Sequence, residues 1–200
     1  MINTVIFDIG MVLVYFRWKE LWKEDFGFSD EEYEIVADAT IRNPWWDEFD
    51  KGQMRNEELI EKFVEAAPQY KKEFETIFEH ATEFIEPYEY AYSWIREMKA
   101  LGKRVYILSN WSEPCFLANI DEKLGFVKEA DGAVISYQEG VIKPSQEIYQ
   151  LICERYEIDP KKAVFIDDNA DNIAGADAFG LNTIHFKTYE QAKAELEKML

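Results

Sequence analysis

The sequence TVIFDIG, at residues 4–10, decides the fold of this chain. Its β-branched and aromatic residues predict a short buried strand that ends at Asp8, and Gly10 stops it. Four further runs have the same character: RVYILSN at 104–110, AVFIDD at 163–168, GAVIS at 132–136 and LNTIHF at 181–186. Short runs that are apolar almost throughout are typical of parallel strands covered on both faces.

Helical patterns separate these runs. Apolar residues recur at helical spacing in 87–100, in the segment that follows Pro144, in 171–179 and in 187–200. Strands that alternate with helices predict an α/β fold with a doubly wound, Rossmann-like parallel sheet. A ligand is expected at the edge of the sheet where the carboxyl ends of the strands meet.

Residues 16–86 carry helical patterns and no strand pattern. The segments are WKELWKEDF (18–26), SDEEYEIVADAT (29–40), NPWWDEFDKG (43–52), NEELIEKFVEA (56–66) and QYKKEFETIFEHA (69–81). Ser29 followed by Glu32 is a capping-box signature for the second of them. Because this block follows the first strand, we expect an all-helical cap at 16–86, inserted into an α/β core at 1–15 and 87–200.

The charge and the cysteines of the chain limit its partners and its location. A total of 40 acidic residues against 22 basic ones gives a formal net charge of -18. Such a surface repels nucleic acid and anionic membranes, so we expect neither as a partner. The first residues lack a signal-peptide pattern, and no stretch approaches the roughly 20 apolar residues of a membrane span. Cys115 and Cys153 lie in apolar helical contexts, which indicates reduced thiols in the cytoplasm, with a disulfide as the alternative.

Polar residues at or just past the predicted strands and loops form the candidate site. They are Asp8, Ser109, Lys143, Asp167 and Asp168. Three carboxylates in one crevice stay ionised together only if a cation lies among them. Oxygen ligands favour a hard ion, and Mg²⁺ suits a site with few protein ligands and a phosphate. The two histidines, His80 and His185, show no metal-ligand spacing.

Four motifs in this order resemble those of the haloacid dehalogenase superfamily. They are FDIGMVLV (7–14), ILSN (107–110), VIKP (141–144) and FIDDNADN (165–172). The resemblance covers essentially the whole chain and falls in the subclass with a helical cap after the first strand. Within it, the sequence is most similar to the α-D-glucose-1-phosphate phosphatase type, particularly over 139–180. A more distant likeness is to the N-terminal phosphatase domain of soluble epoxide hydrolases.

The resemblance implies a magnesium-dependent phosphatase that acts on a small phosphorylated metabolite, as a monomer or homodimer. Asp8 would attack phosphorus and form an aspartyl-phosphate, which splits one hard hydrolysis into two steps. Ser109 would donate to a phosphoryl oxygen, and Lys143 would neutralise charge on the nucleophile and the phosphoryl group.

The same resemblance assigns the metal and the rest of the phosphate cradle. Mg²⁺ would be held by Asp8, by the backbone carbonyl of Gly10 and by Asp168. Asp167 would act as a more distant or water-mediated ligand. Asn110 and backbone N–H groups would complete the cradle, and Asn172 would steady the metal loop, with a plain helix-capping role as its alternative.

Two residues of the cap are candidates for substrate contact. Arg17 lies at the root of the cap, where its guanidinium is able to reach a phosphate. Trp46 would contact the substrate, although at least one of Trp45 and Trp46 is expected to pack the cap against itself. Trp111, just after the second motif, either lines the pocket or seals the core.

Position 10 departs from the superfamily pattern. Most phosphatases of the superfamily have an Asp there, which protonates the leaving group and later activates water. General acid–base assistance of this kind is worth about 10²–10⁴-fold. With Gly10 in its place, the hypothesis is a substrate whose leaving group needs little protonation, such as a sugar 1-phosphate. Otherwise a cap residue or water supplies the proton.

Three other functions compete with the phosphatase. A non-catalytic protein that uses the fold for binding or regulation would explain Gly10, but it has no reason to hold three repelling carboxylates together. A phosphomutase is disfavoured because it must move protons in both directions. A haloacid dehalogenase is disfavoured by the Asp167–Asp168 pair, because dehalogenases lack that pair and need no metal.

Overall fold

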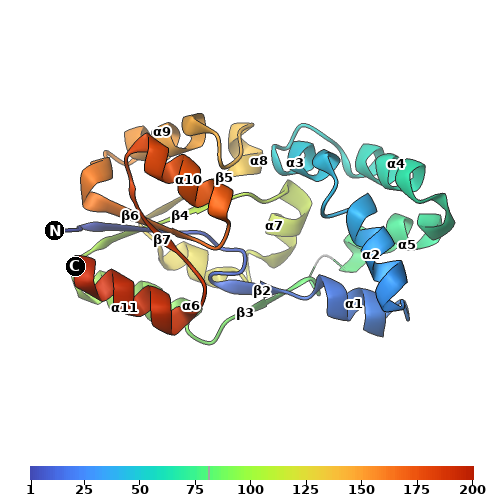
Figure 1. Cartoon of the computed structure of the whole chain (residues 1–200), viewed down its shortest axis with the longest axis horizontal. Helices are drawn as coiled ribbons and strands as arrows, with labels where there is room; N and C mark the ends of the chain where they lie inside the picture. The colour runs from blue at the N-terminus through green and yellow to red at the C-terminus, as the bar shows by residue number, and fades with distance from the viewer. Residues whose placement is uncertain (81) are drawn as a thin grey trace.

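The computed structural model describes residues 1–80 and 82–200, so Ala81, the last residue of the predicted helix 69–81, lies outside the described residues. Five strands form one parallel sheet in the order β5-β4-β1-β6-β7 (Figure 1). They are β1 (Thr4–Phe7), β4 (Arg104–Ser109), β5 (Gly132–Ile135), β6 (Ala163–Asp167) and β7 (Asn182–His185). Each predicted strand is present, and the predicted α/β fold is confirmed.

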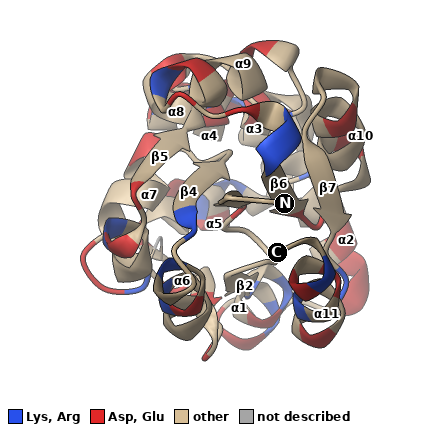
Figure 2. Cartoon of the chain, turned by 90° about the vertical axis from the view of Figure 1, so that its left-hand side faces the viewer, with Lys and Arg blue, Asp and Glu red and all other residues tan. Residues whose placement is uncertain are grey.

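Helices cover both faces of this sheet, as Figures 1 and 2 show. One layer holds α6 (Ala91–Ala100) and α11 (Tyr189–Met199), and the other holds α9 (Gln146–Arg155) and α10 (Ala170–Phe179). Successive residues of β1 alternate between the two layers, because strand side chains point to opposite faces. Val5 and Phe7 belong to the apolar cluster that contains Trp94 of α6, whereas Ile6 belongs to the cluster of α9 and α10.

The cap consists of helices. They are α1 (Trp18–Glu24), α2 (Asp30–Ala39), α3 (Pro44–Asp50), α4 (Asn56–Ala66) and α5 (Lys71–Thr76), with short 3-10 turns at Pro68–Tyr70 and Ile77–His80. The predicted capping box is present, because Ser29 accepts from the Glu32 backbone and Glu32 accepts from the Ser29 backbone. Aromatic side chains fill the interior of the cap, with Trp22, Phe49, Phe63 and Phe74 fully buried.

Two short strands that sequence patterns did not predict join the cap to the sheet. β2 (Val14–Phe16) and β3 (Ile85–Pro87) pair antiparallel, with Phe16 opposite Ile85. The expectation of no strand within 16–86 is therefore wrong at both ends of that range. Three residues are too few to show the two-residue alternation of a strand. The helix predicted over 87–100 also begins later, at Ala91, because Pro87 ends β3.

The remaining elements connect these layers. They are α7 (Glu113–Asn119), α8 (Ser136–Glu139) and 3-10 turns at Gly125–Glu129 and Pro160–Lys162. Cys115 and Cys153 are buried free thiols, as predicted. In the described part of the chain, no helix has both the length and the apolar character that crossing a membrane requires.

The two ends of the chain lie close together, on the side of the sheet away from the cap (Figure 1). The backbone N–H of Ile2 donates to the carbonyl of Met199 at 3.2 Å. The Lys103 ammonium donates to the carbonyls of Ile2 and Leu200, at 2.7 and 3.3 Å. Acidic residues, whose ribbon segments are red in Figure 2, occur on the outer helices of both layers, as the net charge of -18 leads one to expect.

Candidate active site

Four of the predicted side chains meet in one buried cluster at the carboxyl edge of the sheet. Ser109 Oγ donates to Asp8 Oδ1 at 2.6 Å. The Lys143 ammonium lies 2.7 Å from Asp8 Oδ1 and 2.7 Å from Asp167 Oδ2. Asp8, Ser109, Lys143 and Asp167 are all buried, with exposed fractions of 6% or less. The end of β1 is fixed by the Asp8 backbone N–H, which donates to the Ile166 carbonyl of β6.

Lys143 is held by Asn110, which follows β4. The Lys143 backbone N–H donates to Asn110 Oδ1 at 2.9 Å, and Asn110 Nδ2 donates to the Lys143 carbonyl at 3.1 Å. Sequence reasoning assigned Asn110 to the phosphate cradle. In the structure both ends of its amide bind the backbone of the lysine that reaches Asp8, and Asn110 also borders the hollow beside Asp8.

Asp167 is surrounded by donors on both of its oxygens. Asn172 Nδ2 lies 3.1 Å from each oxygen, and the Asn169 backbone N–H donates to Oδ1 at 2.8 Å. With Lys143 on Oδ2, this carboxylate orients the lysine and the loop that follows β6. Asn172 therefore contacts Asp167 directly, whereas the side chain that caps α10 is that of Asn169. Asp168 is less buried, and it borders the hollow beside Asp8.

The electrostatics of the cluster call for a cation. Burial raises the pKa of Asp8 to about 7, with Lys143 opposing the rise and Asp167 adding to it. Burial also raises the pKa of Asp168, to which the charge of Asp167 contributes. For Lys143, burial opposes the charged form, but Asp167 and Asp8 outweigh it and raise its pKa. Three carboxylates and one ammonium carry a formal charge of about -2 when all are ionised.

The donor set of this cluster fits Mg²⁺. Oxygens of Asp8, Asp167 and Asp168 lie within 4.8 Å of one another. Oxygen donors of high negative charge favour a hard divalent ion over a softer one. His80, which the sequence did not link to a metal, lies in a second such group with Asp25 and Glu83 on the cap. Both carboxylates there are exposed, and such surface groups are common without an ion.

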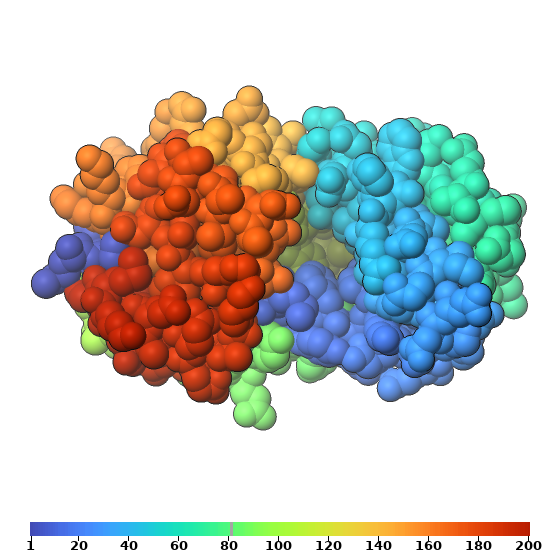
Figure 3. Space-filling view, in the orientation of Figure 1, coloured from blue at the N-terminus to red at the C-terminus, as the bar shows by residue number. Residues whose placement is uncertain are grey.

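Two adjoining hollows open at this cluster, in the depression between sheet and cap that Figure 3 shows. The smaller, of about 180 Å³, is lined by Asp8, Gly10, Ser109, Lys143 and Asp168 among others. The larger, of about 390 Å³, reaches under the cap, and both share Phe16, Asn110 and Asn169. The shared walls indicate one site with a polar end and a cap end.

Aromatic residues dominate the larger hollow. Its lining includes Phe16, Trp18, Trp46, Phe84 and Trp111. Trp46 therefore lies where substrate contact was predicted, and Trp111 lines the hollow. Arg17 lines neither hollow, and its guanidinium is 3.6 Å from Glu24. The structure thus does not bring Arg17 to the hollow beside Asp8, because its side chain pairs with Glu24 along α1.

Sequence reasoning also missed two residues of the site, Phe16 and Asp50. A Cβ atom at Gly10 would lie 2.7 Å from the Phe16 ring. The ring fills the space that a side chain at position 10 would need, and it packs on Trp111 with centroids 5.7 Å apart. Asp50 is the last residue of α3 and lines the larger hollow. It stands in the segment 43–52, whose pattern predicts a helix and does not distinguish Asp50 from the other acidic residues there.

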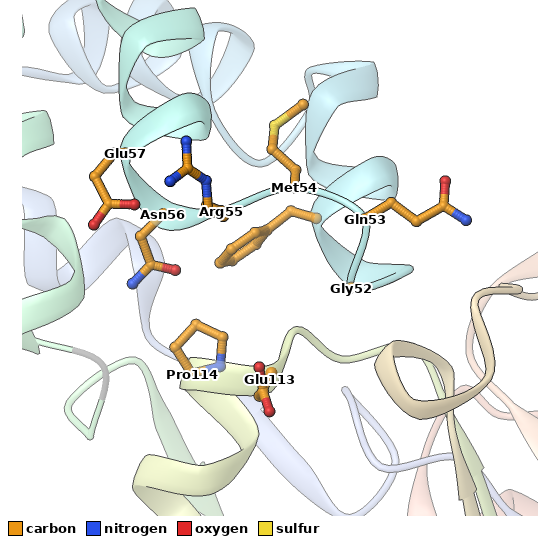
Figure 4. Close-up of a pocket in the computed structure, with 9 residues that line it drawn as sticks. Gly52, Gln53, Met54, Arg55, Asn56, Glu57, Glu113 and Pro114 are labelled. Atoms are coloured by element: carbon orange, nitrogen blue, oxygen red, sulfur yellow. The ribbon is translucent and has the colours of Figure 1, made fainter.

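A third hollow, of about 350 Å³, lies elsewhere along the seam between cap and core. Figure 4 shows it between the cap loop that carries Gly52 to Asn56 and the start of α7 at Glu113 and Pro114. None of its lining residues belongs to the carboxylate cluster. We therefore place the chemistry at the two hollows beside Asp8.

A parallel sheet with a buried carboxylate at the end of β1 and a helical insertion after it defines a class of hydrolases. Residues 2–180 match the family model of haloacid dehalogenase-like hydrolases, so the chain belongs to this family. The sesquiterpene phosphatase astK of Aspergillus oryzae is 24% identical over 198 residues, which cover 99% of this chain and 96% of that protein. The (S)-2-haloacid dehalogenase 1 of a Pseudomonas species is 35% identical over 88 residues, which cover 44% of this chain and 38% of the dehalogenase.

A similar solved structure is the family enzyme bt-2542 of Bacteroides thetaiotaomicron. It superimposes with a TM-score of 0.76 at 22% identity and covers 98% of each chain. The same protein has also been solved as a complex with magnesium and inorganic phosphate, where the TM-score is 0.70. At this identity the likeness establishes the fold.

Proposed function

We propose that this chain is a magnesium-dependent phosphatase that hydrolyses small phosphomonoesters through an aspartyl-phosphate on Asp8. The observation that carries the proposal is the anchoring of one Asp8 oxygen. Ser109 and Lys143 both bind Oδ1, at 2.6 and 2.7 Å. The carboxylate is thereby oriented, and Oδ2 is the oxygen that we assign to attack on phosphorus.

In the proposed reaction, an Asp8 oxygen forms a bond to phosphorus while the bond to the leaving alcohol breaks. Water then attacks phosphorus, releases phosphate and restores the Asp8 carboxylate. Lys143 offsets negative charge on Asp8 and on the phosphoryl oxygens, and the Ser109 hydroxyl would turn its single proton from Asp8 to a phosphoryl oxygen when the substrate binds. Asp167 and Asn110 bind Lys143, and Asn172 binds Asp167, so these three residues keep the lysine in position.

Asp8, the backbone carbonyl of Gly10 and Asp168 would hold the Mg²⁺ ion, because Asp167 is already bound by Lys143 and Asn172. Bound there, the ion supplies charge that offsets the repulsion between the phosphate and Asp8. The magnesium and phosphate complex of bt-2542 supports this assignment by analogy.

A dehalogenase is the second candidate, since haloacid dehalogenases are among the relatives. A haloacid carries a carboxylate that a metal-free site must bind with protein cations. Among the described residues that line the two hollows, Lys143 is the one cation, and it already pairs with two carboxylates. A relative that spans nearly the whole chain is named a sesquiterpene phosphatase, which also favours phosphate chemistry.

The proposed substrate is a small phosphorylated metabolite in the cytoplasm. A sugar 1-phosphate is the member of this class that the likeness to glucose-1-phosphate phosphatases suggests. The larger hollow, at about 390 Å³, has room for such a group, and its aromatic walls suit an apolar or flat one. Values of kcat/KM for a sugar 1-phosphate, an isoprenoid monophosphate and an aryl phosphate would show which of these leaving groups the protein prefers.

Phosphate release from 4-nitrophenyl phosphate tests the proposal. With Mg²⁺ the protein is expected to turn over, and chelation by EDTA or the change Asp8→Asn is expected to abolish turnover. Asp171→Asn is the matched control, because Asp171 is exposed in the first turn of α10 and should leave the rate unchanged. Metal-independent turnover of a 2-haloacid, or inactivity on every phosphomonoester, would contradict the phosphatase.

A further inference from the structure

Asp50 is an acidic side chain of the active-site cleft to which the proposed reaction assigns no role so far. It ends α3, and it is the one acidic residue among the described residues that line the larger hollow. The smaller hollow, where the phosphoryl group is placed, shares three wall residues with it. A leaving group attached to that phosphoryl group must therefore occupy the space that Asp50 borders.

The backbone of Asp50 is docked firmly on the core. Ser136 Oγ, at the start of α8, donates to the Asp50 carbonyl at 2.6 Å. The same hydroxyl accepts from the Trp111 backbone N–H at 2.9 Å. One core hydroxyl thus joins the end of α3 to the loop after β4, which is the loop that begins with Asn110. This bridge holds the Asp50 carboxyl at a fixed place in the cleft without using the carboxyl itself.

The surroundings of Asp50 favour its neutral, proton-bearing form. Burial beside aromatic walls raises the pKa of Asp50 to about 8, and the charge of Asp47 adds to the rise. Lys143 and the Ser112 backbone N–H oppose it to a smaller extent. A carboxyl group kept neutral near pH 7 is able to donate a proton, which an ordinary ionised aspartate cannot do.

The core has no such donor at the position where the family pattern places one. Gly10 carries no side chain, and the Phe16 ring lies where a side chain at this position would begin. A proton for the leaving group must therefore come from elsewhere, and Asp50 borders the hollow on the cap side.

We propose that Asp50 is the general acid of this phosphatase, supplied by the cap in place of the missing residue at position 10. The inference rests on the proposed function. As the bond between phosphorus and the leaving oxygen breaks, its electron pair stays on that oxygen, which takes the proton of Asp50. The resulting carboxylate then accepts a proton from the water that attacks the aspartyl-phosphate, and Asp50 returns to its starting form.

The test compares leaving groups in the variant Asp50→Asn. The Asn side chain keeps the size of Asp50, and the docking bond to Ser136 uses the backbone. For an alkyl phosphate, whose alcohol needs a proton to leave, kcat/KM is expected to fall by about 10²–10⁴-fold. For 4-nitrophenyl phosphate, whose leaving group is stable as an anion, the fall should stay below about tenfold. An equal loss on both esters, or no loss on either, would overturn the role.

Glu48→Gln is the matched control, because Glu48 lies two residues earlier on α3, lines neither hollow and is not among the groups that shift the pKa of Asp50. It should leave both rates within about twofold of the parent. The parent protein offers a second measurement that needs no variant: across a series of substituted phenyl phosphates, kcat/KM should depend weakly on leaving-group pKa. A steep dependence would mean that no acid assists departure.

The proposed function and this inference fail in different ways. If the parent protein hydrolyses no phosphomonoester, both are overturned. If the parent is active and Asp8→Asn is inactive, but Asp50→Asn loses the same factor on both esters, then the phosphatase stands and the role of Asp50 falls.

Discussion

Phe16 occupies the space that any side chain at position 10 would need, and this has consequences for engineering the site. The ring packs on Trp111, so a side chain at position 10 would have to displace it from this aromatic contact. Forcing extra atoms into a packed site costs about 1–3 kcal/mol. The next residue, Met11, already has a left-handed backbone with φ of 54°, which disfavours further local adjustment.

Gly10→Asp is therefore expected to lower the free energy of unfolding by about 1–3 kcal/mol and to leave kcat no higher than in the parent. Denaturant unfolding and steady-state hydrolysis measure the two effects. The double variant Gly10→Asp/Phe16→Ala should lose less stability than the sum of the two single changes, because the contact that opposes Asp is gone. Strict additivity would show that Phe16 is not the obstacle.

Asp50 should also affect how the free energy of unfolding depends on pH. In the unfolded chain its carboxyl loses a proton near pH 4, whereas in the folded protein its pKa is about 8. Between these values the folded state binds more protons, so stability falls as the pH rises through this window. With EDTA present, the free energy of unfolding should decline from pH 5.5 to 8.5. The decline should be shallower in Asp50→Asn, whereas an unchanged slope would mean that Asp50 ionises normally.

At the scale of elements, α6 is attached to the sheet by one large side chain. Trp94 is fully buried, and its ring meets Phe7 of β1 edge-on, with centroids 4.7 Å apart. Removing a buried Trp side chain costs about 3–5 kcal/mol. Trp94→Ala is thus expected to lower the free energy of unfolding by that amount. In contrast, Trp45 is 42% exposed and meets only the Lys62 ammonium, 5.3 Å from the ring centre, among its described ring contacts.

Trp45→Ala serves as the matched control for Trp94→Ala and should cost about 1 kcal/mol or less. Urea titration of both variants checks the pair. Similar losses for the two changes would show that α6 is not anchored through Trp94.

Elements with a strong pattern were predictable from the sequence, whereas elements defined by contacts were not. The five strands of the sheet are apolar runs that are visible in the sequence. Their carboxyl ends bring Asp8, Ser109 and Asp167 together, and this placement does not depend on the conformation of the loops. β2 and β3 form because they pair with each other. Segments of three residues are too short to show a strand pattern, so the sequence does not predict this pairing.

The same distinction holds within the site. Site residues that directly follow a strand, such as Asp8 and Asp168, can be predicted from their position in the sequence alone. The roles of Asn110 and Asp50 depend on which distant segment each one meets: the Lys143 backbone for the first and the core loops for the second. For Arg17 the sequence does not show that its side chain pairs with Glu24, at the end of the helix that Arg17 precedes.

For the whole molecule, the net charge of -18 sets how an anionic substrate approaches. Repulsion acts over a Debye length of about 30 Å at 0.01 M salt and about 10 Å at 0.1 M. Added KCl should therefore raise kcat/KM for a phosphomonoester at constant Mg²⁺, and it should also raise the free energy of unfolding by screening self-repulsion. A kcat/KM that falls steadily with KCl would indicate that a local positive field governs capture instead.

The closeness of residues 2 and 199 has a practical consequence for the topology of the chain. Because both ends lie on the side of the sheet away from the cap, a short Gly–Ser linker is expected to join residue 1 to residue 200 without crossing the cleft. A circular permutant opened at the exposed turn of Leu101 and Gly102 would keep every strand of the sheet intact. The same geometry makes either end a suitable point for attaching the protein to a solid support, with the active site facing away from it.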